Sequence, residues 1–285
     1  MCDREGHSLY VRNQHEQALT ALDYVRDEAG DSAAYHLDRG LVLYALERFD
    51  EAIAEFDAVL EKYPISIRAG TQRAFALARL GRLEEAQEQF EYMLRWRSAL
   101  REYRRIKTTS YLRGNIGVLE LRRGDLEAGR KDLEAALEID GSNDFAGMVL
   151  YKILPQMEAG HLSPESFSHL TAAFESLDLH REVAATRHLQ ALVAGSPTYV
   201  PAYLVLAKGL RESSKYADCE ALLEDAEQKV PGDLTLRIER LRCTILRYGA
   251  SSVGARPAIA EVKKILEEHP TNELARKLLA ALDER

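Results

Sequence analysis

One interval of 34 residues recurs along this sequence and constrains its fold more than any other feature. Ala52 and Ala86 stand 34 positions apart, as do Phe56 and Phe90. A period of about 34 is typical of stacked helix–turn–helix units, none of which can bury its apolar face without a neighbour. The sequence therefore predicts an all-α fold, an α–α superhelix whose interior is shared between successive units. The same interval separates further pairs: Ala173 and Ala207, Leu189 and Leu223, and Pro197 and Pro231.

The clearest unit spans residues 33–66. Leu37, Gly40 and Leu43 follow the spacing of one helix face. After a short break, a second helix is expected to run to Pro64, where it cannot continue. The next unit copies this order, but a serine stands where the closing proline would be, so nothing in the sequence stops its second helix.

The third unit arrives late. Gly81 and Gly124 are 43 residues apart, nine more than the period. We therefore expect an insertion, helical and basic, near residues 95–109. The rhythm then fails over residues 144–165, which predicts an irregular junction in which Pro155 bends or ends a helix.

The period returns over residues 200–233, and a helix start precedes it at the end of the junction. Ser163 and Pro164 form a helix start, an N-cap followed by a proline in the first turn. Near the other end, Thr271 is expected to cap a solitary helix that covers the last apolar face. The sequence thus predicts a solenoid of about six to seven helix–turn–helix units plus a C-terminal capping helix. This single solenoid, residues 1–285, divides into N-terminal repeats (1–143), the junction (144–165), and C-terminal repeats with the capping helix (166–285).

Composition narrows the function and the location. The chain carries 46 acidic and 38 basic residues, a formal net charge of −8, which argues against nucleic acid as the main partner. Hydrophobic residues make up 46% of the chain, as in a folded protein rather than a disordered one. There is no apolar run of roughly 18 residues to span a bilayer, and the first residues lack the apolar core of a signal peptide. We therefore expect a cytoplasmic protein.

The three cysteines, Cys2, Cys219 and Cys243, form no CxxC pair. Their spacing indicates neither a zinc site nor a disulfide framework, and Cys219 occupies a small-residue position that is expected to be buried. Cys2 supports an alternative, because Cys2 followed by Asp3 could be the processed end of a bacterial lipoprotein, with Met1 added for expression. The chain would then be a membrane-anchored bacterial assembly factor, lipidated at Cys2.

Four stretches follow most of a longer pattern: a small residue in the first helix, a glycine before the turn, an aromatic residue or leucine after it, then alanine and a large apolar residue. They are RGLVLYALERFDEAIAEFDAVLEKYP, FALARLGRLEEAQEQFEYML, NIGVLELRRGDLEAGRKDLEAAL and AYLVLAKGLRESSKYADCEALLEDAEQKVP. The first and the last of them also have the closing proline. In this pattern the chain resembles the tetratricopeptide repeat family. The resemblance implies a groove, lined by first helices, that holds peptides or other proteins. A cation-and-amide clamp for carboxylate-ended peptides, used by one subclass, is not expected, because the matching positions hold Leu37 and Leu41.

The inserted stretch is the first candidate binding surface. Residues 95–113 hold seven basic residues and one acidic residue. If the second helix of the second unit continues past its missing proline, Trp96, Leu100 and Tyr103 share one helix face. Three basic residues then form a stripe on the neighbouring face: Arg97, Arg101 and Arg104.

Three interpretations of this arginine stripe, residues 95–107, stay open. It is a solvated cationic face that balances acidic helices nearby, a site for an acidic protein segment, or a contact for nucleic acid or anionic lipid.

The repeat register defines a second candidate surface. First helices are expected to turn seven polar side chains toward one concave surface, where an anionic, extended ligand would bind. They are Arg68, Gln72, Arg79, Asn115, Arg122, Lys152 and Lys208. The alternative is that each is an ordinary exposed polar residue. Glu120, at a position that is usually apolar in this repeat, either pairs with Arg123 along its helix or lines the groove.

No set of residues supports catalysis. The sequence has no HExxH zinc motif, no glycine-rich loop ending in GK[ST] and no GxSxG nucleophile motif, so we expect no enzyme activity, no cofactor and no metal. The sequence favours a non-catalytic scaffold or adaptor that binds a partner protein or peptide, acidic if the basic residues carry recognition, in the concave groove.

Overall fold

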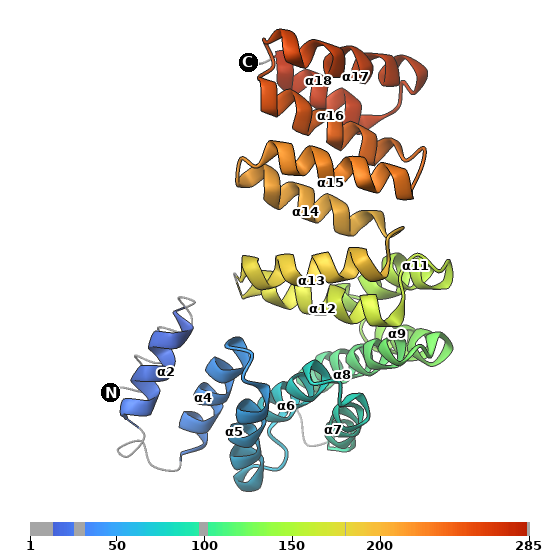
Figure 1. Cartoon of the computed structure of the whole chain (residues 1–285). Helices are drawn as coiled ribbons and strands as arrows, with labels where there is room; N and C mark the ends of the chain where they lie inside the picture. The colour runs from blue at the N-terminus through green and yellow to red at the C-terminus, as the bar shows by residue number, and fades with distance from the viewer. Residues whose placement is uncertain (1–13, 26–31, 97–101, 180, 284–285) are drawn as a thin grey trace. The chain divides into compact units, whose positions relative to one another are not determined.

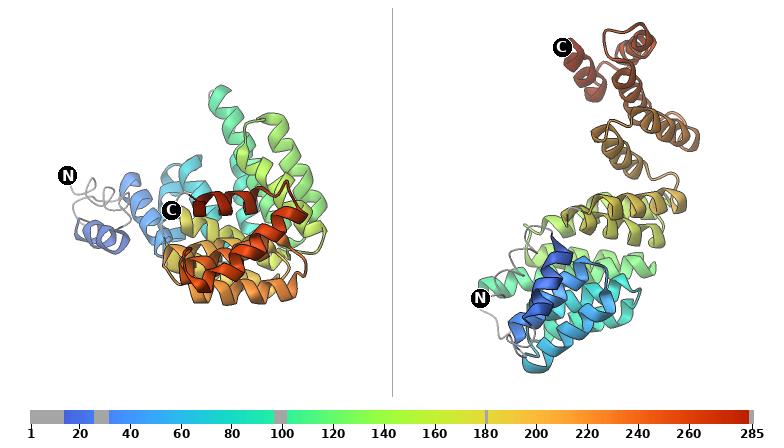
Figure 2. Two further views of the ribbon diagram at one scale, coloured as in Figure 1. Left: turned by 90° about the horizontal axis from the view of Figure 1, so that it is seen from above. Right: turned by 60° about the vertical axis from the view of Figure 1, so that its left-hand side comes forward.

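The computed structural model of the protein describes residues 14–25, 32–96, 102–179 and 181–283 (Figure 1). These residues form helices joined by short turns, and no strand occurs among them. Consecutive helices lie side by side as antiparallel pairs, which Figure 2 shows from two further directions. The predicted all-α fold of stacked helical hairpins is confirmed.

The N-terminal repeats follow the predicted pairing. The helix α2 precedes three hairpins, each made of a first and a second helix. The bounds are α2 His15–Tyr24, α4 Ala33–Ala45 with α5 Phe49–Lys62, α6 Ile67–Arg79 with α7 Leu83–Arg95, and α8 Glu102–Arg123 with α9 Leu126–Ile139. The periodic residues form their core: Ala52, Ala86 and Phe56 are 0% exposed and Phe90 is 1% exposed.

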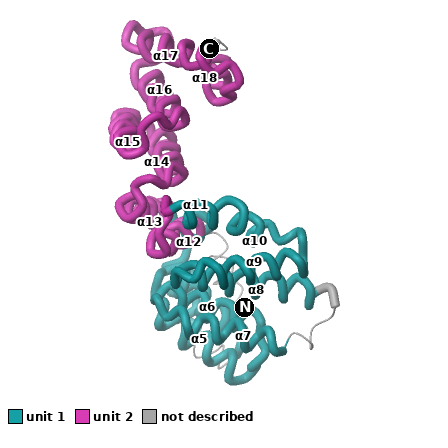
Figure 3. Tube along the Cα trace, turned by 90° about the vertical axis from the view of Figure 1, so that its right-hand side faces the viewer, with its two compact units in different colours: residues 1–159, 175–181 teal, residues 160–174, 182–285 magenta. Residues whose placement is uncertain are grey.

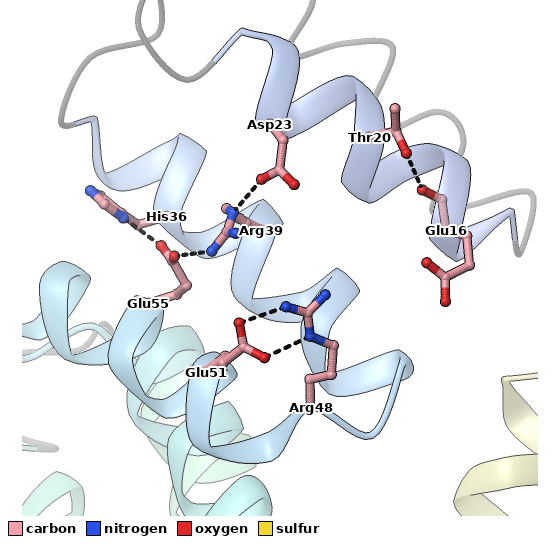
Figure 4. Close-up of polar contacts among 8 residues, drawn as sticks. All are labelled: Glu16, Thr20, Asp23, His36, Arg39, Arg48, Glu51 and Glu55. Atoms are coloured by element: carbon pink, nitrogen blue, oxygen red, sulfur yellow. Dashed lines mark hydrogen bonds and ion pairs between the residues drawn. The ribbon is translucent and has the colours of Figure 1, made fainter.

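An arginine in each of two first helices bridges successive repeats, and Figure 4 shows the first of them, Arg39. The Arg39 guanidinium donates to Asp23 of α2 at 3.0 Å and also to Glu55 of α5. Exactly one period later in the chain, the pattern recurs: Arg73 donates to Asp57 at 2.6 Å and to Gln89 at 3.3 Å. The register therefore places α2 as the second helix of a preceding repeat.

The predicted helical extension of the second unit is wrong. α7 ends at Arg95, and the basic residues Arg104, Arg105 and Lys107 lie instead in the first turns of α8, which begins at Glu102. Without a proline the sequence cannot say which of two neighbouring helices takes the extra residues. At the other end of α8, the basic residues Arg122 and Arg123 complement the helix dipole.

The junction is a helix interrupted by one wider turn. α10 (Asp144–Met148) passes through a π-helical turn (Val149–Ile153) into α11 (Leu154–Glu158). The π turn directly precedes Pro155, as expected where a proline removes one backbone donor from a helix. Pro155 does not end the helix, which continues to Glu158, and the junction over residues 144–165 stays a prediction.

The C-terminal helices also form successive hairpins. Ser163 caps the first of them by accepting from the Ser166 amide at 3.1 Å, as predicted. Asn272, not Thr271, caps the terminal helix, because its side chain accepts from the Ala275 amide at 3.0 Å. The bounds are α12 Pro164–Asp178, α13 Glu182–Gly195, α14 Val200–Glu212, α15 Tyr216–Lys229, α16 Leu234–Tyr248, a 3₁₀ turn Val253–Ala255, α17 Arg256–Glu268 and α18 Glu273–Asp283.

The chain divides into two compact units (Figure 3). Unit 1 comprises Met1–Ala159 together with Glu175–Arg181, and unit 2 comprises Gly160–Phe174 together with Glu182–Arg285. The end of α12 thus belongs to the N-terminal repeats, although the rest of that helix belongs to unit 2. The arrangement of both units as a single solenoid stays a prediction.

Unit 2 contains a disulfide that the cysteine spacing did not predict. Cys219 of α15 and Cys243 of α16 are both 0% exposed, and their sulfur atoms are bonded. They are 24 residues apart in sequence, so no local sequence motif predicts that they pair. The stacking of one hairpin on the next brings their two helices together. Burial of Cys219 is confirmed.

The packing of α8 against α9 in unit 1 depends on glycine. A Cβ added at Gly117 of α8 would lie 2.9 Å from the carbonyl oxygen of Gly129 in α9, whereas one added at Gly209 of α14 would meet nothing within 4 Å. We expect Gly117→Ala to lower the free energy of unfolding by about 1–3 kcal/mol, because backbone atoms must move apart. We expect the control Gly209→Ala to raise it by roughly 0.5–1 kcal/mol, because alanine favours the helix. Urea unfolding of both variants measures the difference, and equal effects would contradict this account of helix spacing.

Candidate partner-binding site

The predicted surface residues have different surroundings in the structure. Arg79 of α6 and Arg122 of α8 come together in unit 1 and are described below. Exposed or half-buried side chains outside that cluster are Arg68 and Gln72 of α6, Arg104 at the start of α8, Lys152 in the junction and Lys208 of α14. Arg97 and Arg101 lie outside the described residues, so the face shared by the arginine stripe remains a prediction.

Asn115 lies on α8 as expected, but its side chain is turned inward. The residue is only 6% exposed, and its amide nitrogen donates to the backbone carbonyl of Tyr111 at 2.8 Å. This donor is therefore already used within its own helix.

Arg79 is the centre of the cluster. Its side chain is 11% exposed, and Nη1 donates to Oε2 of Glu175 at 3.0 Å. Its Nη2 lies 3.6 Å from a carboxylate oxygen of Glu47, and its guanidinium stands over the Phe49 ring, 4.8 Å from the centroid. An arginine so far removed from water must be paired and hydrogen-bonded to be tolerated, and these contacts meet that need.

The hydroxyl of Tyr44 shares the same carboxylate oxygen. It donates to Oε2 of Glu175 at 2.9 Å, and its ring meets Phe49 edge to face at 5.3 Å between centroids. Burial, with the negative charge of Glu175 as the next cause, raises the pKa of Tyr44 well above its usual range. The hydroxyl therefore keeps its proton and serves as a fixed donor.

Arg122 adds a second buried cation from the next first helix. Its Nη2 donates to the backbone carbonyl of Ala78 at 2.7 Å. Burial lowers the pKa of Arg122, and the nearby carboxylate of Glu175 opposes that shift. Glu175 thus draws on donors and charge from three successive repeats: α4, α6 and α8. We call Tyr44, Glu47, Phe49, Arg79 and Arg122 the Glu175 site.

The carboxylate in this site comes from far along the chain. Glu175 lies in the last turn of α12, 131 residues from Tyr44 and 96 from Arg79. Arg181, in the same segment, approaches Glu47 at 3.3 Å. No sequence pattern predicts this insertion, because Glu175 belongs to no period shared with the repeats that hold it.

Glu47 carries the one local signal that was available. It has a φ of 61°, and the turns of the next two repeats have glycine at the equivalent place, Gly81 (φ 79°) and Gly124 (φ 87°). This left-handed conformation costs a residue with a side chain about 1–2 kcal/mol. A glutamate at a turn position where the next two repeats have glycine therefore indicates that the glutamate side chain has a role of its own.

Unit 2 also contains a buried carboxylate that is paired with arginines of its first helices. Glu239 of α16 is 7% exposed, and one carboxylate oxygen lies 2.7 Å from Nη1 of Arg211 in α14. Arg242, one turn further along α16, approaches the other oxygen at 3.1 Å. Both cations are thus engaged with a carboxylate inside unit 2.

Two other kinds of site do not occur among the residues that the structure describes. They contain no group of three or more histidine, cysteine, aspartate or glutamate side chains placed to hold a metal ion. Within the same ranges, every helix falls short of the length or the apolarity that crossing a bilayer requires.

Comparison with known proteins identifies the repeat. Residues 4–66 match the model of the tetratricopeptide repeat family, which covers α2 and the hairpin α4–α5 with its arginine bridge. Over these residues the chain is similar to the tetratricopeptide repeat family. No curated protein sequence matches it.

Solved structures of tetratricopeptide repeat proteins match the chain over most of its length. A tetratricopeptide repeat protein from Parabacteroides merdae is 16% identical, covers 99% of this chain and 97% of its own, and gives a TM-score of 0.47. The C-terminal part of a repeat-containing protein from Cytophaga hutchinsonii is 16% identical, with coverage of 97% and 99% and a TM-score of 0.45. The TPR2AB domain of yeast Sti1, in complex with pHSP90, is 20% identical, with coverage of 86% and 98% and a TM-score of 0.39.

The hairpin α8–α9 of unit 1 buries a carboxyl group in its interior. Glu120 of α8 is 7% exposed, and burial first, then the charge of Asp132, raises its pKa to about 7. Arg123, its expected helical partner, lies 3.9 Å from Glu84 instead. Because the folded-state pKa exceeds the ordinary value of 4.5, Glu120 costs stability as the pH rises from about 4.5 to 7, and the full cost is present above pH 7.

We therefore expect Glu120→Gln to stabilise the protein at pH 8. A raised pKa of this size corresponds to a gain on the order of 2 kcal/mol, and the gain should vanish toward pH 5, where Glu120 is protonated. Urea unfolding at pH 5, 6.5 and 8 measures it, with Glu134→Gln on the exposed face of α9 as the matched control. A gain that is equal at all three pH values would show that the charge of Glu120 is not its cause.

Proposed function

We propose that this protein is a non-catalytic scaffold that binds a segment of a partner protein on the first-helix face of its N-terminal repeats. Tetratricopeptide repeats are interaction modules, and this proposal concerns where and how this chain binds. One observation carries it: Arg79 and Arg122, from neighbouring first helices, stand half-buried beside Tyr44 around a single carboxylate.

The physical case rests on preorganisation. Arg79 is held over Phe49 and beside Glu47 by the fold itself, so an incoming acidic side chain finds donors that are already oriented. Fixed, partly desolvated guanidinium groups bind carboxylates more strongly than exposed ones do, because little water competes. The ordering cost of binding then falls on the partner segment and not on the repeat.

The arginine stripe over residues 95–107 supports a weaker alternative, binding of nucleic acid or another anionic ligand. Of its basic residues within the described ranges, Lys107 lies 2.7 Å from Asp140, whereas Arg104 is exposed. That alternative predicts binding that weakens steeply with salt and is lost in Arg101→Glu with Arg104→Glu.

Cross-linking capture tests the scaffold proposal. The bait is the folded full chain, compared with Arg79→Gln/Arg122→Gln, with Arg97, Arg101 and Arg104 changed together to Glu, and with Lys264→Glu as a control on an exposed lysine of α17. We expect partners that are recovered by the wild type, by the triple variant and by the control, but reduced at least about tenfold by the double glutamine variant, since two charge-assisted contacts are removed. Thermal melts establish that each bait is folded. No specific partner, or recovery by the double variant equal to the wild type, would contradict the proposal.

The location of the protein also remains a proposal. The sequence favours the cytoplasm, but the bond between Cys219 and Cys243 favours the alternative of an oxidising compartment, including a lipid-anchored form at a bacterial membrane, because structural disulfides are rare in the cytosol.

Trapping thiols in intact cells separates these two locations. If the protein resides in an oxidising compartment, alkylation during denaturing lysis should leave Cys219 and Cys243 unmodified until a reductant is added. Mass spectrometry of the two peptides reads this directly. Complete alkylation of both cysteines without reductant would support the cytoplasm and remove the disulfide argument.

A further inference from the structure

We infer that Glu175 is a built-in ligand of the N-terminal repeats, occupying a carboxylate-recognition site that a partner's acidic side chain must take over. This inference deepens the proposed function and rests on it for the partner's identity as an acidic segment. The internal contact itself stands on the geometry of unit 1 alone.

The first argument is the form of the contact. Both the Tyr44 hydroxyl, at 2.9 Å, and Nη1 of Arg79, at 3.0 Å, converge on one oxygen of Glu175. The donors are 8% and 11% exposed, whereas the Glu175 side chain is 35% exposed. The buried, oriented donors correspond to a binding site, and the more exposed carboxylate corresponds to its ligand.

The second argument is chain topology. The tyrosine and the two arginines of the site lie in α4, α6 and α8, in successive repeats, whereas Glu175 comes from the end of α12, 96 residues from Arg79. Glu175 is half-buried. Phe174, Leu177 and Asp178 on the same helix end are exposed, whereas Ser176 is buried. The site therefore receives one carboxylate from a segment that keeps part of its surface in water.

The third argument is the second anchor of the same segment. Arg181 lies 3.3 Å from Glu47, and the same Glu47 oxygen lies 3.6 Å from Arg79. Glu47 holds this place despite a positive φ of 61°. The repeats thus present a cation to Glu175 and an anion to Arg181, a pair of contacts of opposite sign that fits this one segment in one direction.

Occupancy by a tethered ligand changes what a partner must do. A segment on the same chain competes at an effective concentration in the millimolar range. A partner peptide that offers one carboxylate therefore binds more weakly to the intact site than to a site whose own ligand is weakened. This predicts that the variant Glu175→Gln gains affinity for an acidic peptide.

The probe is a fluorescein-labelled synthetic peptide with the sequence of residues 170–183, LTAAFESLDLHREV. Fluorescence anisotropy measures its binding to the full-length wild type, to Glu175→Gln, to Glu175→Gln/Arg79→Gln, and to Glu182→Gln. Glu182 is an exposed neighbour of the segment and serves as the matched control. A second peptide carries glutamine in place of its Glu175.

We expect the acidic peptide to bind Glu175→Gln about tenfold or more tightly than it binds the wild type. Glu182→Gln should match the wild type, and both the added Arg79→Gln change and the glutamine peptide should abolish the gain. Equal binding to the wild type and Glu175→Gln, no measurable binding to Glu175→Gln, or a gain that survives Arg79→Gln would overturn the inference.

Hydrogen exchange supplies a readout that needs no partner and no peptide. Amides of residues 176–179 should exchange at least about tenfold faster in Glu175→Gln than in the wild type or Glu182→Gln, while the amides of α4 and α6 keep their rates, because only the local contact is lost. Unchanged exchange would overturn the built-in ligand and leave the scaffold proposal standing. If no partner is captured but Glu175→Gln shows the expected faster exchange, the scaffold proposal is contradicted and the built-in ligand stands.

Discussion

Every hairpin in this chain depends on a neighbour to cover its apolar face. Phe56 and Phe90, with the small residues Ala52 and Ala86 beside them, are buried in one core that runs through successive hairpins of unit 1. Burying each phenylalanine contributes roughly 2–3 kcal/mol, and a hairpin taken alone would forgo most of it. Stability is therefore shared between nearest neighbours, and each stack needs end pieces such as α18, whose apolar face packs on α16 and α17.

Polar contacts in the chain repeat with the same period as its core. Arg39 and Arg73 each reach back to an aspartate of the preceding second helix and across to the second helix of their own repeat. These bridges fix the lateral register of hairpins that apolar packing alone would allow to slide. They also explain why a basic side chain on a first helix is weak evidence for a ligand: the repeat itself supplies acceptors for it.

Structural features that repeat along the chain could be predicted from the sequence, whereas features that occur only once could not. The 34-residue interval locates the hairpins from α4 to α7 and the buried phenylalanines, because each unit must satisfy the same packing. The boundary of the basic insertion could not be placed, since no proline marks the end of α7. The disulfide Cys219–Cys243 and the contact of Glu175 with Arg79 are tertiary contacts that each occur once. No sequence period connects the residues that make them.

The predicted site shows the same division. Arg79 and Arg122 follow from the repeat register, which turns first-helix positions to one side. Asn115 follows from it too, yet its side chain donates to the backbone carbonyl one turn earlier in its own helix. Register gives the helix face on which a residue lies; the conformation of a long polar side chain depends on neighbours that the register does not specify.

Glu47 shows that the turn and the site place opposite demands on one position. Glycine at this turn would avoid the 1–2 kcal/mol or so that a left-handed glutamate costs, and the next two repeats use glycine there. Partly exposed ion pairs such as those with Arg79 and Arg181 return about 1 kcal/mol or less. Stability alone therefore favours glycine at position 47. A carboxylate kept there against that preference contributes instead to orientation, because it holds Arg79 toward Glu175 and fixes Arg181 on the other side of the same segment.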